Sequence, residues 1–155
     1  YGPRQSLRAI IPTIITQLLN KKLNKIKLGN INVKRDFNFI SDTVDGFIST
    51  IKNEKIIGET INIGNNYEIS IKDIYTIISK QLKINKKIII DKPRVRSFGT
   101  EVKRLFASNK KAKKLLNWSP KFKNKNGIEN GIKIAIEWYK EPNNIKKFKS
   151  DIYNI

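Results

Sequence analysis

The chain has 155 residues and a formal net charge of +19, from 32 Lys and Arg against 13 Asp and Glu. It contains no Cys and no His, which excludes a disulfide framework and thiolate chemistry and argues against a zinc site. No apolar run approaches the roughly 20 residues that a membrane span needs, and the first residues lack a secretory signal. We therefore expect a soluble, cytoplasmic, metal-free protein without membrane association.

The basic charge comes from lysine far more than from arginine. The chain holds 26 Lys and only 6 Arg, and it is also rich in Ile and Asn. Lys, Ile and Asn share A/T-rich codons, so codon bias explains these excesses together, whereas a selected phosphate-binding face favours Arg. We interpret the lysines as a solvated surface and the arginines as the informative cations. A basic nucleic-acid-binding module stays as an alternative reading.

Hydrophobic periodicity predicts short strands that alternate with helices along the chain. Pro12 fits the first turn of a helix, so the first helix begins either near Ser6 or near Ile11. Ser70 and Asp73 have the spacing of a capping box. The predicted strands are residues 25–28, 36–40, 60–64 and 87–91. The predicted helices are residues 6–22, a segment to 51 that follows the N-cap candidates Ser41 and Asp42, a segment from 70 to 82, one from Ser108 or Asn109 to 116, and 128–139.

This alternation predicts an α/β layer fold. The strong strands are short and very apolar, which is typical of a sheet covered on both faces, and they amount to about half a sheet. The chain has no Met and opens on Tyr1-Gly2-Pro3, so we expect a piece of a longer protein. From Pro142 onward the chain is polar, and we expect a domain portion at residues 1–139 and a loosely attached tail at 140–155.

No catalytic constellation is found in the sequence. Asp42 and Asp45 lie three residues apart, which predicts a solvated first helical turn rather than a metal site. The sequence has no G-x-G-x-x-G loop, so it carries no dinucleotide fingerprint.

Isolated polar residues at predicted strand ends are the candidate binding residues. In open α/β sheets, ligands bind beyond the carboxyl ends of the strands. Arg35 and Arg96 suit a diphosphate through bidentate, charge-assisted hydrogen bonds. Glu101 suits the hydroxyl groups of a ribose, and Asn62 can donate and accept. The alternative is purely structural: Arg35 pairs with a nearby aspartate, Asn62 satisfies a backbone group, and Arg96 pairs with Glu101.

Five short motifs, taken together and in order, resemble the C-terminal half of an extended short-chain dehydrogenase/reductase that acts on nucleotide sugars. The resemblance covers about residues 1–139 and is strongest to NAD-dependent 4,6-dehydratases. The motifs are Tyr1-Gly2-Pro3-Arg4-Gln5, Arg35-Asp36-Phe37-x-Phe39-Ile40-x-Asp42, Ile61-Asn62-Ile63-Gly64, Arg96-x-x-x-x-Glu101-Val102 and Asn109-x-Lys111-Ala112-x-x-x-Leu116-Asn117-Trp118-x-Pro120.

This resemblance implies roles for individual residues in binding the substrate. Arg35 would contact the nucleotide diphosphate, and Asn62 would lie in the same nucleotide-sugar pocket. Arg96 would contact phosphate, Glu101 would contact ribose, and Arg8 would lie near the sugar or phosphate.

The resemblance also implies a fold and a reaction. The fold would be the C-terminal part of a Rossmann-like doubly wound sheet with the small substrate-binding α/β subdomain. Tyr1, Gly2 and Pro3 would border the NAD or NADP pocket, and the glycine-rich loop and catalytic Tyr-x-x-x-Lys pair would lie upstream. The implied activity is a nucleotide-sugar 4,6-dehydratase, with a 4-epimerase as the alternative. The intact protein would be a homodimer that binds no nucleic acid.

Overall fold

The computed structural model describes residues 1–51, 53–95 and 99–148, and it has the α/β architecture that the sequence predicts. The helices are α1 (Ile10–Leu19), α2 (Ile40–Ile51), α3 (Ile71–Leu82), α4 (Lys110–Leu116), α5 (Asn124–Lys140) and α6 (Pro142–Ile145), with 3-10 turns η1 (Glu54–Ile56) and η2 (Lys92–Arg94). The strands are β1 (Lys25–Leu28), β2 (Lys34–Asp36), β3 (Glu68–Ser70), β4 (Lys87–Ile90) and β5 (Arg104–Leu105).

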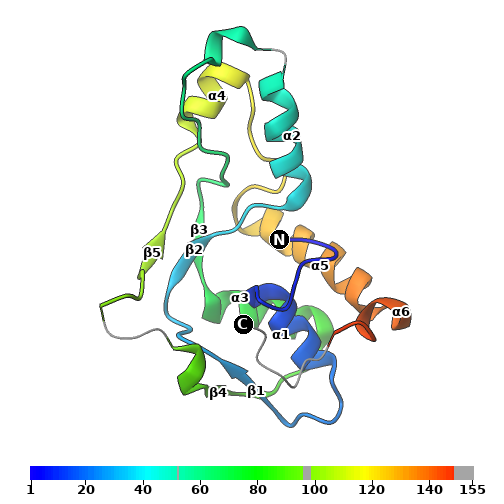
Figure 1. The fold of residues 1–155 in the computed structure, drawn as a ribbon. Helices are drawn as coiled ribbons and strands as arrows, with labels where there is room; N and C mark the ends of the chain where they lie inside the picture. Colours follow the sequence, from blue (N-terminus) through cyan, green and yellow to red (C-terminus); the bar gives the residue numbers. More distant parts are fainter. Residues whose placement is uncertain (52, 96–98, 149–155) are drawn as a thin grey trace.

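The molecule is elongated, with a broad base and a narrow upper part (Figure 1). Helices α1, α3, α5 and α6 and the strands β1 and β4 form the base, whereas α2 and α4 stand in the upper part. Strands β2, β3 and β5 run between the two. The hydrophobic core therefore concentrates in the base, where α1, α3 and α5 pack against one another.

The core follows the periodicity that predicted the helices. Helices α1, α3 and α5 each turn apolar residues inward, as expected for residues three and four apart. The largest fully buried side chains are Ile11, Ile14, Ile15 and Leu18 of α1, Ile26 and Leu28 of β1, Ile74 and Ile78 of α3, and Ile128, Ile132, Ile136 and Tyr139 of α5. The Tyr139 hydroxyl donates a hydrogen bond to the Gln5 carbonyl at 2.5 Å, which ties the last long helix to the first residues.

Strands β1 and β4 form a parallel pair in which Lys25 lies opposite Lys87 and Leu28 opposite Ile90. The outer edge of β1 is closed by the Gln17 side chain from α1. The Lys27 N–H donates to Gln17 Oε1 at 2.7 Å, and Gln17 Nε2 donates to the Lys27 carbonyl at 3.1 Å. The carboxyl ends of both strands lie at one edge of this pair.

The second sheet has the order β3-β2-β5, with β2 antiparallel to β3 and parallel to β5. Strand β2 ends at Asp36, whereas the sequence predicted a strand over residues 36–40. Helix α2 begins at Ile40, before the predicted N-cap residues. Its Asp42 is instead 1% exposed, and its carboxylate accepts hydrogen bonds from the backbone N–H groups of Lys121 and Phe122 at 3.1 and 2.9 Å. The prediction of a solvated Asp42 was wrong.

Asn65 and Asp36 hold the strands to the loops around them. The Asp36 carboxylate accepts from the backbone N–H groups of Asn65 at 2.8 Å and Ala107 at 3.3 Å. The buried Asn65 side chain donates to the carbonyl groups of Phe37 and Phe122 at 3.1 and 2.9 Å, and its oxygen accepts from the Asn124 N–H at 3.1 Å. Burial raises the pKa of the Asp36 carboxyl above its usual range, against the opposing effect of these N–H groups.

Two further predictions differ from the structure. Residues 60–64 lie outside any strand, because no strand of the described residues pairs with them. Within the predicted polar tail, α6 forms a short helix, and the Phe148 ring packs 5.4 Å from the Tyr139 ring and 6.1 Å from the Trp138 ring. The capping box is confirmed, since Ser70 Oγ accepts from the Asp73 N–H at 3.0 Å.

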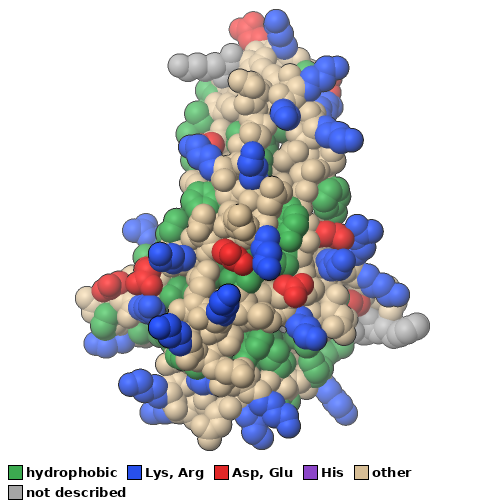
Figure 2. Space-filling view, turned by 180° about the vertical axis from the view of Figure 1, so that it is seen from behind, with side chains coloured by type: hydrophobic (Ala, Val, Ile, Leu, Met, Phe, Trp, Pro, Cys, Tyr) green, Lys and Arg blue, Asp and Glu red, His purple; other side chains and the backbone are tan. Residues whose placement is uncertain are grey.

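Lysine and arginine side chains are spread over the face drawn in Figure 2 rather than gathered into one patch. Hydrophobic side chains also reach the surface along the narrow upper part. None of the described helices combines the length and the hydropathy that crossing a membrane requires.

The buried Asp42 carboxylate gives a stability prediction. Asp42→Asn replaces one oxygen with an NH2 group, so one of the two backbone N–H groups loses its acceptor. We expect the free energy of unfolding to fall by about 1–3 kcal/mol, measured by urea denaturation of the intact protein. Asp45→Asn on the same helix is the control, because Asp45 pairs with the exposed Lys121 Nζ at 2.8 Å. Equal small effects of both changes would contradict the structural role of Asp42.

Tyr139 gives a prediction at alkaline pH. Burial raises the pKa of its phenol from 10.0 to about 12. The stabilisation from burying the neutral phenol is therefore complete below about pH 10 and is lost as the pH rises through about 12. We expect Tyr139→Phe to lose stability at neutral pH, where it lacks the bond to Gln5, and to show a shallower decline of the urea midpoint above pH 10. Parallel pH profiles of the two proteins would refute this.

Candidate functional site

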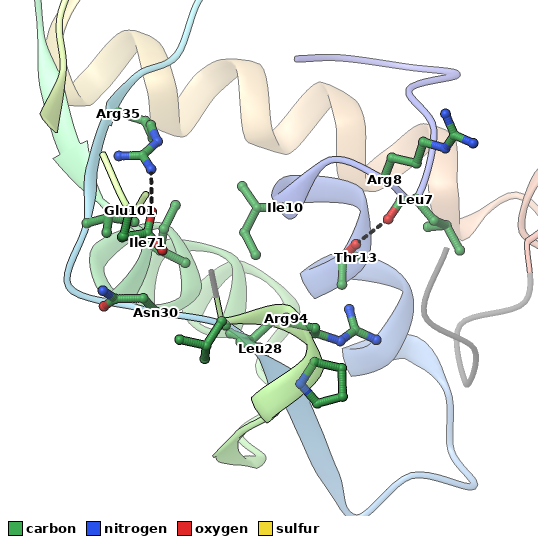
Figure 3. A pocket seen from close by; sticks show the side chains of 14 residues that line it. Leu7, Arg8, Ile10, Thr13, Leu28, Asn30, Arg35, Ile71, Arg94 and Glu101 are labelled. Atoms are coloured by element: carbon green, nitrogen blue, oxygen red, sulfur yellow. Dashed lines mark hydrogen bonds and ion pairs between the residues drawn. The ribbon is translucent and has the colours of Figure 1, made fainter. Parts of the chain in front are cut away.

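A cleft of about 300 Å³ lies at the carboxyl ends of β1 and β4 (Figure 3). Leu28, Gly29 and Asn30 continue from β1 into its floor, while the start of α1 and the 3-10 turn η2 form its walls. The chain after β1 passes tightly against η2, because a Cβ on Gly29 would lie 2.5 Å from the Arg94 carbonyl oxygen. The cleft is thus where the sequence analysis expected a ligand site, beyond parallel strand ends.

Arg35 and Glu101 lie together on one side of this cleft. Arg35 Nη2 and Glu101 Oε1 are 3.2 Å apart, and their side chains are 19% and 21% exposed. Arg35 Nη1 also donates to the Lys34 carbonyl at 2.8 Å. Arg35 therefore pairs with Glu101 and not with a nearby aspartate, the structural alternative considered from the sequence.

Arg8 and Arg94 supply two more guanidinium groups to the lining, across Ile10 from Arg35 in the view of Figure 3. Arg94 Nε pairs with Asp91 Oδ2 at 2.9 Å, which orders the turn after β4. Arg8 is exposed at the start of α1. The sequence analysis gave the phosphate contact to Arg96 and assigned no role to Arg94, although the place of Arg94 directly after a strand and Pro93 was a usable signal.

The first turn of α1 adds to this positive environment. Ile10 of that turn lines the cleft, and the N-cap residue Ala9 provides no side-chain hydrogen bond to the first N–H groups. Uncapped N–H groups and the helix dipole favour an anion at a helix N-terminus. The lining of the cleft thus carries three guanidinium groups and one carboxylate, that of Glu101, while Asp91 pairs with Arg94 outside the lining.

Not all of the predicted substrate-binding residues come together. Arg8, Arg35 and Glu101 share the lining of the cleft. Asn62 is exposed and lies outside that lining. Arg96 lies outside the described residues.

Tyr1, Gly2 and Pro3, the predicted cofactor-side residues, pack against the chain and do not line the cleft. The Tyr1 ring lies edge-on to Phe39, with centroids 5.3 Å apart, and its hydroxyl donates to the Ile128 carbonyl at 3.3 Å. Burial, and secondarily the charge of Asp42, raises the pKa of the Tyr1 phenol. A Cβ on Gly2 would lie 2.7 Å from Ile40 Cγ2, so a larger residue here would require the Ile40 side chain to move.

These contacts do not fit a dinucleotide site made by this chain alone. The Tyr1 hydroxyl is already bonded to Ile128, and the sequence offers no glycine-rich loop for a pyrophosphate. Within the described residues, no group of three carboxylates is placed to hold a metal ion. The guanidinium groups and Glu101 of the cleft can bind a ligand that carries an anionic group next to hydroxyl groups.

Comparisons with known proteins agree with this chemistry. The chain is 33% identical over 151 residues to the UDP-glucuronate 4-epimerase of Thermodesulfobacterium geofontis, covering 97% of the chain and 43% of that protein. It is 29% identical over 150 residues to the human dTDP-D-glucose 4,6-dehydratase, covering 91% of the chain and 39% of that protein.

A solved structure with the same fold is the UDP-glucuronic acid 4-epimerase of Bacillus cereus in complex with UDP-glucuronic acid and NAD. The TM-score is 0.78 at 29% identity, and the match covers 91% of this chain and 42% of that protein. The chain thus spans about two-fifths of the length of its relatives.

A family model described as GDP-mannose 4,6 dehydratase matches residues 1–131, which is well over half of the chain. The α/β fold class predicted from the sequence is confirmed by the same likeness to epimerases and dehydratases. This chain belongs to the GDP-mannose 4,6-dehydratase family of NAD-dependent nucleotide-sugar epimerases and dehydratases.

Proposed function

We propose that this chain is the substrate-binding part of an NAD-dependent nucleotide-sugar 4,6-dehydratase. The observation that carries the substrate-binding role is the shared lining of one cleft beyond the strand ends by Arg8, Arg35, Arg94 and Glu101. The NAD or NADP site and the catalytic residues are assigned to a part of the protein outside these 155 residues. The chain's coverage of about two-fifths of its relatives supports that division.

The cleft suits the nucleotide diphosphate of such a substrate. Guanidinium groups bind phosphate oxygens through paired, charge-assisted hydrogen bonds, and the open first turn of α1 faces the same space. Glu101 accepts hydrogen bonds from the ribose hydroxyl groups. We keep Arg96 in this set on the strength of its motif, and Asn62 as a more distant member.

Binding is also how this part contributes to rate. A nucleotide held by Arg35 and Glu101 places the attached sugar in a fixed position, and correct positioning removes part of the entropic barrier of the reaction. These residues bind and orient the substrate. We further propose that the intact protein is a homodimer located in the cytoplasm.

A 4-epimerase is the second candidate. It is favoured by the identity of 33% to one UDP-glucuronate 4-epimerase and of 29% to another of known structure. The dehydratase is favoured by the family match over residues 1–131. Both activities require the nucleotide to be bound in the same way, so the cleft alone is compatible with either reaction.

The product distinguishes the two reactions. We expect the intact protein, given NAD and in turn GDP-mannose, dTDP-glucose and UDP-glucose, to yield from one of them a 4-keto-6-deoxy sugar whose mass is lower by one water. UDP-glucuronic acid is tested beside them for epimerisation alone, because its C6 carboxylate leaves no C6 hydroxyl group to eliminate. An unchanged mass with inverted C4 stereochemistry, read by NMR, would establish the epimerase instead. Binding of duplex DNA with steep salt dependence, and of none of these nucleotide sugars, would favour a nucleic-acid-binding module.

Arg35 gives the sharpest test of the cleft. Arg35→Ala removes a charge-assisted contact worth about 1.5–3 kcal/mol, so we expect the Michaelis constant for the nucleotide sugar to rise about ten- to a hundredfold. Arg104→Ala is the matched control, because Arg104 on β5 is exposed, pairs with Glu68 and lies outside the cleft lining. An unchanged Michaelis constant in Arg35→Ala would remove Arg35 from the site.

A further inference from the structure

The three guanidinium groups in the lining of the cleft have different partners. Arg94 pairs with Asp91 at 2.9 Å, and Arg35 Nη2 pairs with Glu101 Oε1 at 3.2 Å. No carboxylate of the described residues forms an ion pair with Arg8. Among the described residues that line the cleft, Glu101 alone carries a negative charge. It therefore sets the charge on the side of the cleft where Arg35 lies.

The ion pair between Arg35 and Glu101 is partly removed from water. The two side chains are 19% and 21% exposed. Arg35 is also held by its own strand, because Nη1 donates to the Lys34 carbonyl at 2.8 Å. In Figure 3 the guanidinium group of Arg35 points to the Glu101 carboxylate. A ligand anion that binds Arg35 therefore comes next to that carboxylate.

Two anionic groups beside one guanidinium group repel each other. Like charges at such short range disfavour one another, and the repulsion is stronger where water is partly excluded. A phosphate group at Arg35 must therefore tolerate the charge of Glu101 or displace it. Displacement leaves a partly buried carboxylate without its partner, which destabilises that state.

Hydroxyl groups on the same ligand change this balance. A carboxylate accepts hydrogen bonds through both oxygens, and an O–H group that donates to a charged oxygen makes a short, strong bond. A ligand with hydroxyl groups near its phosphate supplies Glu101 with new donors when the phosphate takes Arg35. Inorganic pyrophosphate brings negative charge and no alcohol group.

We propose that Glu101 is a specificity-determining residue, which keeps Arg35 from anions without neighbouring hydroxyl groups and releases it to a nucleoside diphosphate. Arg35 exchanges a carboxylate for a phosphate, while Glu101 exchanges a guanidinium group for the ribose hydroxyl groups. Binding sites commonly reject a wrong ligand through such a repulsive element.

The inference rests on the proposed function, which places Arg35 at the diphosphate and Glu101 at the ribose. It goes further because it couples the two contacts. The ion pair seen in the cleft is then the state that a ligand must replace, and only a ligand with both chemical groups replaces both partners.

Calorimetric titration of the intact protein with inorganic pyrophosphate tests the exclusion. Glu101→Gln keeps the size of the side chain and removes its charge, so we expect the dissociation constant for pyrophosphate to fall about tenfold or more. Glu68→Gln is the matched control, because Glu68 is 18% exposed, pairs with Arg104 at 2.8 Å and lies outside the cleft lining. An unchanged dissociation constant in Glu101→Gln, or equal changes in the two variants, would overturn the proposal.

A double variant shows whether the effect acts through Arg35. In a protein that carries Arg35→Ala, we expect Glu101→Gln to change the dissociation constant for pyrophosphate less than about threefold, because no guanidinium group is released. A tightening as large as in Glu101→Gln alone would place the effect outside the ion pair and refute the proposal.

Nucleotide analogues give a measurement on the unaltered protein. We expect UDP or GDP to bind at least about tenfold more tightly than its 2′,3′-dideoxy form, which has no hydroxyl group for Glu101. Equal measured affinities for the two forms would overturn the proposal. Tighter pyrophosphate binding by Glu101→Gln, with no binding of UDP or GDP by the unaltered protein, would support the exclusion by Glu101 and remove the proposed function.

Discussion

Three short polar side chains, one in β2, one in α2 and one just before β3, hold the upper part of the molecule to its base. Asp36, Asp42 and Asn65 each bind backbone groups that lie far away in the sequence. These groups belong to loops without regular structure, which cannot satisfy their own N–H and C=O groups. Apolar packing cannot replace these hydrogen bonds, because the loop N–H and C=O groups would then have no partner. The position of β2, and with it that of Arg35, therefore depends on this network.

The same network explains why the Arg-Asp-aromatic motif serves two purposes. Arg35 reaches into the cleft, and the next residue, Asp36, points to the opposite side because successive strand residues alternate. Arg35 presents a positive charge to a ligand, while Asp36 holds in place the strand on which Arg35 lies. The sequence analysis weighed ligand binding against an ion pair for Arg35, gave Asp36 no role in holding the strand, and expected Asp42 to be solvated.

Sequence patterns predicted what depends on local periodicity. The stripes of α1, α3 and α5, the strands β1 and β4 and the Ser70 cap follow from residues within a few positions of one another. The partner of Arg35 and the burial of Asp42 depend on contacts 66 and 79 or more positions away, which no local pattern encodes. The apolar spacing in α2 predicted that helix correctly, but periodicity does not tell whether a stripe is buried, and the large apolar side chains of α2 are exposed.

The two hydrogen bonds between the Gln17 side chain and the Lys27 backbone affect how the protein can associate with other chains. Exposed strand edges are templates on which further chains assemble into aggregates. Because one side-chain amide occupies both backbone groups of Lys27, a foreign strand arriving at that side of β1 would have to displace it. The Gln17 side chain of α1 therefore blocks the addition of another strand to this edge of the β1–β4 pair.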